Sequence, residues 1–264
     1  MKDIATKIQL KNISKTFRLG NNSFNDVKVV YNTNLSIKEG EFVIICGPSG
    51  SGKSTMLNML IGLEKPTTGN VYHDDFDIYE LNQDKRAKLR LSKIGVVFQQ
   101  SIWLKNLPVL ENVAMPFFFS GHGYKESLNK AMTALQSVNM DSFAKRLPSE
   151  LSGGQQQKIA VARALLNDPE VLIADEPTGN LDTESSNEVM KEFLNLNDKY
   201  KKTIVMVTHN LAYLKLSDKN YYVKDGRLYP LDFKNKKVPD SISEIEKIIS
   251  KRVGVPVDVK GLEK

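Results

Sequence analysis

The segment FVIICGPSGSGKST, residues 42–55, decides the fold. It opens with FVIIC, a continuous apolar run that is typical of a strand buried on both faces of a sheet. The following GPSGSGKST has the GxxxxGK[ST] spacing of a phosphate-binding loop. A helical pattern begins at Lys53, and its apolar residues are Met56, Leu57, Leu60 and Ile61. Strand, glycine-rich loop and helix in this order predict that a phosphorylated ligand binds where the strand ends.

The residue types of this loop match the chemistry of phosphate binding. Glycines allow backbone N–H groups to turn inward, and a helix that begins at Lys53 directs its N-terminal dipole at the same anion. Lys53 can reach the β- and γ-phosphates, and the Ser54 hydroxyl can bind Mg²⁺. A glycine- and serine-rich turn with an unrelated lysine is the alternative, but the flanking strand and helix favour nucleotide binding. The expected contact residues are Gly47, Pro48, Ser49, Gly50, Ser51, Gly52, Lys53, Ser54 and Thr55.

A second apolar strand, VLIA at residues 171–174, ends in the adjacent carboxylates of Asp175 and Glu176. Two such groups are costly inside a core, whereas the carboxyl edge of a parallel sheet faces a ligand crevice. Beside a phosphate-binding loop, this pair predicts a Walker B strand. Asp175 is then expected to hold Mg²⁺, and Glu176 is expected to act as general base on the attacking water.

Apolar strands alternate with helical segments along most of the chain, which predicts an α/β fold with a parallel sheet covered on both faces. The strands are expected at residues 8–13, 42–46, 94–98, 171–174 and 203–207, and helices after 53 and at 185–196. Residues 99–158 carry helical spacing at 110–119 and 124–138 instead, and we expect an inserted helical subdomain there. The predicted cassette spans residues 1–230.

Residues 231–264 extend beyond this cassette. Ser241 and Glu244 have the spacing of a capping box, and the helix that follows carries Ile242, Ile245, Ile248 and Ile249 on one face. The stretch VPVDV after Gly254 alternates like a short strand, so a small α/β tail is predicted. We expect the isoleucine face to pack on the chain's own core, with a second copy or a membrane partner as the alternatives.

Composition excludes several classes of protein. The chain has 264 residues, of which 41% are hydrophobic, and a formal net charge of +6. No run approaches the roughly 18–20 apolar residues that a membrane-spanning helix needs. The basic residues are mostly lysines dispersed among acidic ones, which indicates a solvated surface and no nucleic-acid partner. The single cysteine, Cys46, lies within the strand FVIIC and is expected to be an inert core thiol.

The motif LSGGQ at residues 151–155, together with the phosphate loop, the Asp175–Glu176 pair and a histidine after TIVMVT, resembles the ATP-binding cassette ATPases. Order and spacing agree over roughly residues 5–230. The resemblance implies a P-loop NTPase with a RecA-like core and an antiparallel β subdomain. It also implies that ATP is bound with Mg²⁺ and hydrolysed.

The resemblance assigns roles residue by residue. Phe17 matches the aromatic that stacks on adenine, although the family more often has tyrosine, and a core aromatic is the alternative. Gln99 matches the glutamine that contacts Mg²⁺, so the implied metal ligands are Ser54, Gln99 and Asp175. Ser152, Gly153 and Gly154 match the signature that contacts ATP on a second subunit, and Asp182 matches the dimer seam. His209 matches the switch histidine, which makes Glu176, His209 and Lys53 the implied catalytic residues.

The stretches IGVVFQ, LPVLENVAMPFF and DEPTGNLD resemble the MacB/LolD/FtsE group of cassettes. Such a cassette implies a bacterial homodimer that drives a separate transmembrane permease from the cytoplasmic face of the membrane, exporting or extracting peptide, drug or lipoprotein. A regulatory cassette that gates a partner in cell-wall hydrolysis is the alternative, and a non-transport ATPase is a further one. Asn210 departs from the aspartate that usually follows the histidine.

Two further expectations concern individual side chains. In the loop SIWLKNL, residues 101–107, Trp103, Leu104 and Leu107 form a candidate docking surface for the permease, with Trp103 as its aromatic anchor. Packing of Trp103 inside the helical subdomain is the alternative. His73 and His122 lie in polar, turn-like stretches and are expected at the surface.

Overall fold

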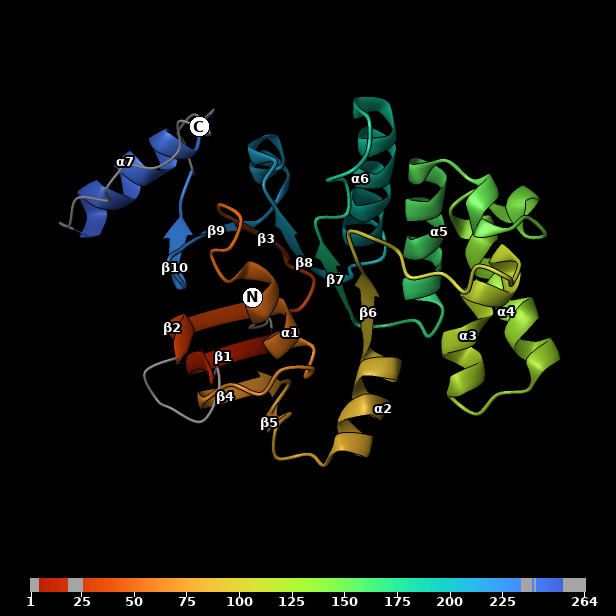
Figure 1. Ribbon diagram of the computed structural model, residues 1–264, viewed down its shortest axis with the longest axis horizontal. Coiled ribbons are helices and arrows are strands. Elements are labelled where there is room, and N and C mark those ends of the chain that lie inside the picture. Colours follow the sequence, from red (N-terminus) through yellow and green to blue (C-terminus); the bar gives the residue numbers. More distant parts are fainter. Residues whose placement is uncertain (1–4, 19–25, 234–238, 240, 254–264) are drawn as a thin grey trace.

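The computed structural model describes residues 5–18, 26–233, 239 and 241–253. Two sheets form its framework (Figure 1). The smaller has the order β2-β1-β4-β5, and the larger has the order β10-β9-β3-β8-β7-β6. The strands are β1 (Thr6–Phe17), β2 (Val27–Lys38), β3 (Phe42–Cys46), β4 (Thr68–His73), β5 (Phe76–Asp77), β6 (Ile94–Val97), β7 (Val171–Asp175), β8 (Thr203–Thr208), β9 (Lys219–Lys224) and β10 (Arg227–Leu231).

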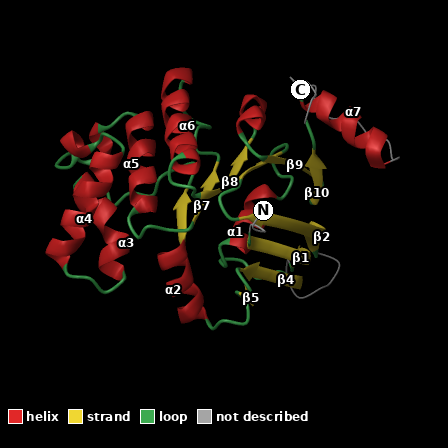
Figure 2. Cartoon of the chain, turned by 180° about the vertical axis from the view of Figure 1, so that it is seen from behind, coloured by secondary structure: helices red, strands yellow, loops and turns green. Residues whose placement is uncertain are grey.

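Helices cover the larger sheet and form a separate group beside it (Figure 2). The α-helices are α1 (Lys53–Leu60), α2 (Gln83–Lys93), α3 (Val109–Phe119), α4 (Tyr124–Ser137), α5 (Gly153–Leu165), α6 (Thr183–Asp198) and α7 (Ile242–Val253). The 3₁₀ turns are η2 (Asp141–Phe143), η3 (Pro148–Glu150) and η4 (Leu211–Leu216). Among the described residues, no helix combines the length and apolar character that crossing a bilayer requires.

The order of the larger sheet places the chemistry-bearing strand ends together. β3, β8, β7 and β6 are parallel neighbours, so β3 and β7 flank β8 directly. Their carboxyl ends therefore bring the phosphate loop after Cys46, the carboxylate of Asp175 and the residue after Thr208 to one edge. This arrangement confirms the predicted α/β fold of the P-loop type, with the antiparallel β1–β2–β4–β5 subdomain beside it.

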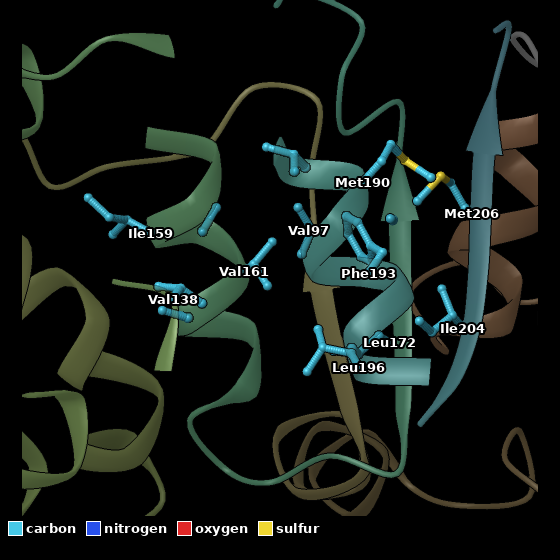
Figure 3. Close-up of a cluster of buried hydrophobic side chains, with 14 of the residues drawn as sticks. Val97, Val138, Ile159, Val161, Leu172, Met190, Phe193, Leu196, Ile204 and Met206 are labelled. Atoms are coloured by element: carbon cyan, nitrogen blue, oxygen red, sulfur yellow. The ribbon is translucent and has the colours of Figure 1, made fainter. Parts of the chain in front are cut away.

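Alternating side chains of the buried strands supply two separate cores. Ile44 and Cys46 of β3 face the cluster formed with α5, α6 and the helical region, whereas Val43 and Ile45 face α1 and the smaller sheet. In the first cluster, Phe193 of α6 packs among side chains from the sheet and α5 (Figure 3). Burial of a strand on both faces explains why FVIIC is apolar throughout.

The predicted helices at 110–119 and 124–138 correspond to α3 and α4, which pack against α5 in one group (Figure 1). Position 158, where the predicted subdomain ends, lies inside α5. α5 begins in the helical group and continues to β6, where the carbonyl oxygen of Ala164 lies so close to Gly95 that a Cβ there would approach it to 2.4 Å. α5 thus joins the helical group to the sheet.

Two further expectations concern the C-terminal tail and His73. The isoleucine face of the tail forms α7, with Ile245 and Ile249 buried in the chain's own core. The predicted strand VPVDV lies outside the described residues. The surface placement of His73 is wrong: its ring is buried, with Nε2 at 2.6 Å from the Leu60 carbonyl oxygen. His73 is the last residue of β4 and points inward by strand alternation.

Candidate nucleotide-binding site

A cavity of about 590 Å³ lies at the carboxyl edge of the larger sheet. It is lined by residues of the loop after β3, by the ends of β7 and β8, and by three side chains from other elements. The lining residues are Val29, Gly47, Pro48, Ser49, Gly50, Gly52, Lys53, Ser54, Thr55, Gln99, Asp175, Glu176, His209 and Ile242. The structure thus brings together the predicted phosphate loop, the Walker B carboxylates, the glutamine and the histidine.

Lys53 is folded back onto its own loop. Its ammonium donates to the carbonyl oxygens of Gly47, at 2.9 Å, and Pro48, at 2.7 Å. Burial lowers the pKa of this lysine, and the nearby carboxylates of Glu176 and Asp175 oppose that shift. The lysine is therefore a partly desolvated cation held at the cavity by two carbonyl oxygens, which an incoming phosphate can replace as its partners.

Close contact with β9 fixes the start of the phosphate loop. A Cβ at Gly47 would lie 2.2 Å from the carbonyl oxygen of Val223, so the position accepts glycine alone. The Ser51 carbonyl oxygen accepts from the N–H of Gly226, in the turn between β9 and β10, at 3.1 Å. The Ser51 hydroxyl is buried, with no hydrogen-bond partner in the described part of the chain. β9 and the turn after it therefore support the phosphate loop through contacts at Gly47 and Ser51.

Asp175 and Ser54 meet at the bottom of the cavity. The Ser54 hydroxyl donates to the Asp175 carboxylate, and both residues line the cavity wall. Burial raises the pKa of Asp175, while the Ser54 hydrogen bond and the Lys53 charge act against the rise. A carboxylate and a hydroxyl in contact form a pair of oxygen ligands of the kind that Mg²⁺ prefers.

Glu176 and His209 form a contact across the ends of β7 and β8. Oε2 of Glu176 lies 2.8 Å from Nδ1 of His209 and accepts from the His209 backbone N–H at 3.2 Å. Glu176 has a φ of 48°, which is uncommon for a residue with a side chain and is typical of functional sites. This backbone conformation turns Glu176 out of the strand direction, while its N–H remains bonded to the Val207 carbonyl oxygen at 2.9 Å.

Gln99 reaches the cavity from the end of β6, and a second glutamine supports that segment. Gln157 of α5 is 4% exposed, and its amide donates to the Phe98 carbonyl oxygen at 3.1 Å. The Ser101 hydroxyl donates to the same side chain at 3.4 Å. α5 is thereby tied to both sides of Gln99. Sequence reasoning missed Gln157 because its position after LSGGQ resembles any polar residue on a helix.

The signature residues lie outside this cavity. Ser152 caps α5, accepting from the Gln155 N–H at 3.3 Å, and is exposed together with Gly153. A Cβ at Gly154 would lie 2.7 Å from the Ser185 side chain, so α5 and α6 pack closely where they begin. Asp182 caps α6 and is exposed too. Ser152, Gly153 and Asp182 therefore form an exposed surface on the same chain, separate from the phosphate loop.

Phe17 ends β1 opposite Val27, and the Lys15 ammonium lies 4.8 Å from its ring centroid. It is half-buried and is not one of the described residues that line the cavity. Its expected contact with adenine stays a prediction. Val29 of β2 and Ile242 of α7 do line the cavity. No motif marks either of them, since each is an ordinary apolar residue brought to the cavity by tertiary packing.

A family model described as "ABC transporter" matches residues 30–179. The chain belongs to the ABC transporter family. It is thus an ABC ATPase cassette, and the sequence expectation is confirmed. The cassette is 44% identical over 225 residues to the uncharacterized ABC transporter ATP-binding protein MJ0796 of Methanocaldococcus jannaschii, covering 84% of this chain and 94% of that one. A solved dimer of MJ0796 in a post-hydrolysis state, bound to ADP and Pi, has a TM-score of 0.77 at 41% identity, covering 85% of this chain and 99% of the other.

The cassette is also similar to proteins of the predicted group. It is 41% identical to the macrolide export ATP-binding/permease protein MacB of Syntrophobacter fumaroxidans, covering 84% of this chain but only 31% of MacB. It is 42% identical to the lipoprotein-releasing system ATP-binding protein LolD of Rickettsia bellii, covering 84% of this chain and 96% of LolD. These relatives confirm the MacB/LolD resemblance of the sequence.

A second, apolar cavity of about 670 Å³ lies between the helical group and the sheet. Ile102, Leu104 and Phe119 line it and are 75%, 50% and 70% exposed. Trp103 packs within the helical group, as the alternative predicted: its Nε1 donates to the Gln156 side chain at 3.0 Å, and Arg163 stacks on its ring at 4.4 Å. Its role as an anchor for the permease stays a prediction. Successive residues of this extended loop point to opposite sides, so Trp103 packs inward and its neighbours face the cavity.

Proposed function

We propose that this chain is the ATP-hydrolysing subunit of a bacterial transporter of the MacB or LolD type. Two copies close around two ATP molecules and drive a separate transmembrane permease. One observation carries the proposal: Lys53, Asp175 and Glu176 converge on one cavity, while the signature at Ser152 lies on an exposed surface elsewhere on the same chain. A second cassette is required to bring a signature to each cavity.

The residues of the cavity divide the chemistry among them. Loop N–H groups and the N-terminus of α1 bind the phosphates, and Lys53 exchanges its two carbonyl partners for phosphate oxygens. Glu176 takes the proton of the attacking water, and His209, in contact with the same carboxylate, orients it and stabilises the charge that develops on the phosphate. Burial of Lys53 strengthens its attraction for that charge.

The donor set fits Mg²⁺, with Ser54, Asp175 and Gln99 at the cavity. In the described part of the chain, no three His, Cys, Asp or Glu side chains come together as a metal site. With so few protein ligands, a bound Mg²⁺ would take the rest of its coordination from phosphate oxygens and water. The metal neutralises phosphate charge when it is bound, and Asp175 must be ionised to hold it.

The permease is proposed to insert a helix into the apolar cavity beside α3. Exposed Ile102, Leu104 and Phe119 line this cavity, and a concave, mainly apolar surface is suited to an apolar helix of a partner. A partner docked there contacts the helical group and the sheet together, and Gln157 connects the same region to Gln99. The cassette is accordingly placed on the cytoplasmic face of the membrane, held by its permease.

Replacement of the proposed base tests the function. We expect Glu176→Gln to lower the rate of ATP hydrolysis by about 10²–10⁴-fold, because general-base catalysis is lost, and to leave ATP affinity within about twofold. Hydrolysis is measured as released phosphate, and affinity is measured with a fluorescent ATP analogue.

Glu184→Gln is the matched control, because Glu184 is an exposed glutamate in the first turn of α6. It is expected to hydrolyse ATP at the wild-type rate. A wild-type rate in Glu176→Gln contradicts the assigned base.

In a separate arm, Lys53→Ala is expected to lose nucleotide affinity, and undiminished affinity contradicts the nucleotide site itself.

A further inference from the structure

The C-terminal helix α7 packs onto the cassette as an integral part of it. Ile245 and Ile249 are 0% and 3% exposed and belong to the same core cluster as Tyr222 of β9 and Leu231 of β10. In Figure 1, α7 lies beyond β10, the edge strand of the larger sheet. The helix therefore has a fixed place beside the cavity.

A buried polar contact fixes the register of α7. Glu246 is 2% exposed, and a buried carboxylate is costly unless it is paired. Its Oε1 accepts from the Tyr222 hydroxyl at 3.0 Å and pairs with the Lys224 ammonium at 2.7 Å. An apolar face alone tolerates sliding and rotation, whereas these two directed contacts specify a single position of the helix on β9.

The strand that holds Glu246 is the strand that supports the phosphate loop. Tyr222 lies opposite Cys46, the residue before Gly47, in the parallel pairing of β3 with β9. Val223, between the two partners of Glu246, places its carbonyl oxygen against Gly47. The seat of α7 and the support of the loop therefore belong to one short segment of β9.

The first residue of α7 reaches the nucleotide cavity. Ile242 lines it together with His209 and Gly50. Ile242 and His209 also line an adjoining cavity of about 660 Å³ that is bounded by η4 and Pro239. Ile242 and His209 thus lie between the nucleotide cavity and the adjoining cavity. His209 is also the residue that contacts Glu176.

We propose that α7 is part of the nucleotide site, in which Ile242 forms an apolar wall of the cavity and Glu246 is the positioning residue that sets it there. Ile242 loses water contact when the nucleotide binds and excludes water from the side of the cavity at His209. The proposal rests on the proposed function, because the ligand concerned is ATP.

The test measures the Kd of a fluorescent ATP analogue for the full-length chain. We expect Ile242→Ala to raise this Kd about three- to tenfold, because part of an apolar side chain no longer contacts the nucleotide. Ile248→Ala is the matched control: it is the same substitution in the same helix, at a half-buried residue that is not one of the described residues lining the cavity. It is expected to leave the Kd unchanged.

Glu246→Gln tests the positioning role, because it keeps the shape of the side chain and removes the charge that pairs with Lys224. We expect it to raise the Kd in the wild-type background and to have no further effect in the Ile242→Ala background. Additive effects would show that Glu246 acts in some other way and would overturn its assignment. The Tm of each variant shows whether a raised Kd comes from the missing apolar contact or from a destabilised fold.

An unchanged Kd in Ile242→Ala, or an equal loss in Ile248→Ala, overturns the inference. Lys53→Ala distinguishes failure of the inference about α7 from failure of the proposed function. If Lys53→Ala loses affinity and Ile242→Ala does not, the nucleotide site stands without α7. If Lys53→Ala retains wild-type affinity, the proposed function fails as well.

Discussion

His73 is a buried histidine held by a single backbone group. Its Nε2 lies 2.6 Å from the Leu60 carbonyl oxygen at the end of α1, so the ring connects β4 to the helix that follows the phosphate loop. Burial lowers the pKa of His73, and Lys7 acts in the same direction, while the Leu60 hydrogen bond and Asp74 oppose the shift. The ring is therefore neutral in the folded protein around neutral pH.

This shift gives the folded protein a dependence on pH. In the unfolded chain the pKa of a histidine is about 6.5, so below that pH the unfolded chain takes up a proton that the folded chain refuses. The contribution of His73 to stability is therefore present above about pH 6.5 and falls as the pH drops toward the folded pKa. We expect the Tm to fall between pH 7.5 and pH 5.5, and His73→Asn to reduce that fall. His122→Asn, at an exposed histidine, is expected to keep it, and equal pH dependence in His73→Asn and wild type would contradict the argument.

Residues in a local motif could be predicted from the sequence, and residues that act by tertiary packing could not. Lys53 lies at the cavity as expected, because its strand, loop and helix are contiguous in the chain, and Glu176 does so because it directly follows a buried strand that ends at the same edge of the sheet. Burial of Cys46 is confirmed, and it raises the pKa of the thiol to about 12. His73, Gln157 and Ile242 carry no local signal, since each is defined by what a distant element places against it.

At the level of elements, the loop before α3 shows how alternation decides which side chains face the apolar cavity. Ile102 and Leu104 face the apolar cavity and Trp103 lies between them, turned toward Gln156 and Arg163. The sequence predicted a docking surface of Trp103, Leu104 and Leu107 with Trp103 as its anchor, and of these three residues Leu104 lines the cavity. The buried strands and helices were predicted well, because period-2 and period-3.6 patterns report burial directly, whereas a short loop has no such pattern.

The exposed side chains of this loop predict the effect of a charge at the proposed permease contact. We expect Ile102→Glu to abolish co-purification with a transmembrane protein from detergent-solubilised membranes of the source organism, because a carboxylate has no partner in an apolar contact. The soluble cassette is expected to hydrolyse ATP at the wild-type rate. Phe76→Glu is the control, at an aromatic of β5 that is 53% exposed and not one of the described residues lining this cavity. Equal recovery of the membrane protein by both variants would remove the docking role from this cavity.

For the whole molecule, the separation between the cavity and the signature is the decisive feature. Ser152 and Gly153 form an exposed, capped helix N-terminus and do not line the nucleotide cavity. Such a terminus attracts an anion, and in the proposed dimer the γ-phosphate bound to a second cassette would supply one. The sequence alone predicted this only through the family resemblance, because no pattern in one chain reports a surface completed by another copy.

A negative charge at Ser152 therefore distinguishes ATP binding by a single chain from ATP-dependent closure of the dimer. Ser152→Asp keeps the cap of α5, since aspartate caps as well as serine, and adds a negative charge opposite the partner's γ-phosphate. In a Glu176→Gln background, which retains ATP, we expect size-exclusion chromatography to show an ATP-dependent dimer for Ser152 and a monomer for Ser152→Asp. The Kd of the monomer for the fluorescent ATP analogue is expected to stay within about twofold, because Ser152 does not line the cavity of its own chain.

Ser137→Asp, at an exposed serine that ends α4, is expected to dimerise normally. If Ser152→Asp lowers the affinity of the monomer as strongly as it blocks the dimer, the signature acts within its own chain and the two-chain site is wrong.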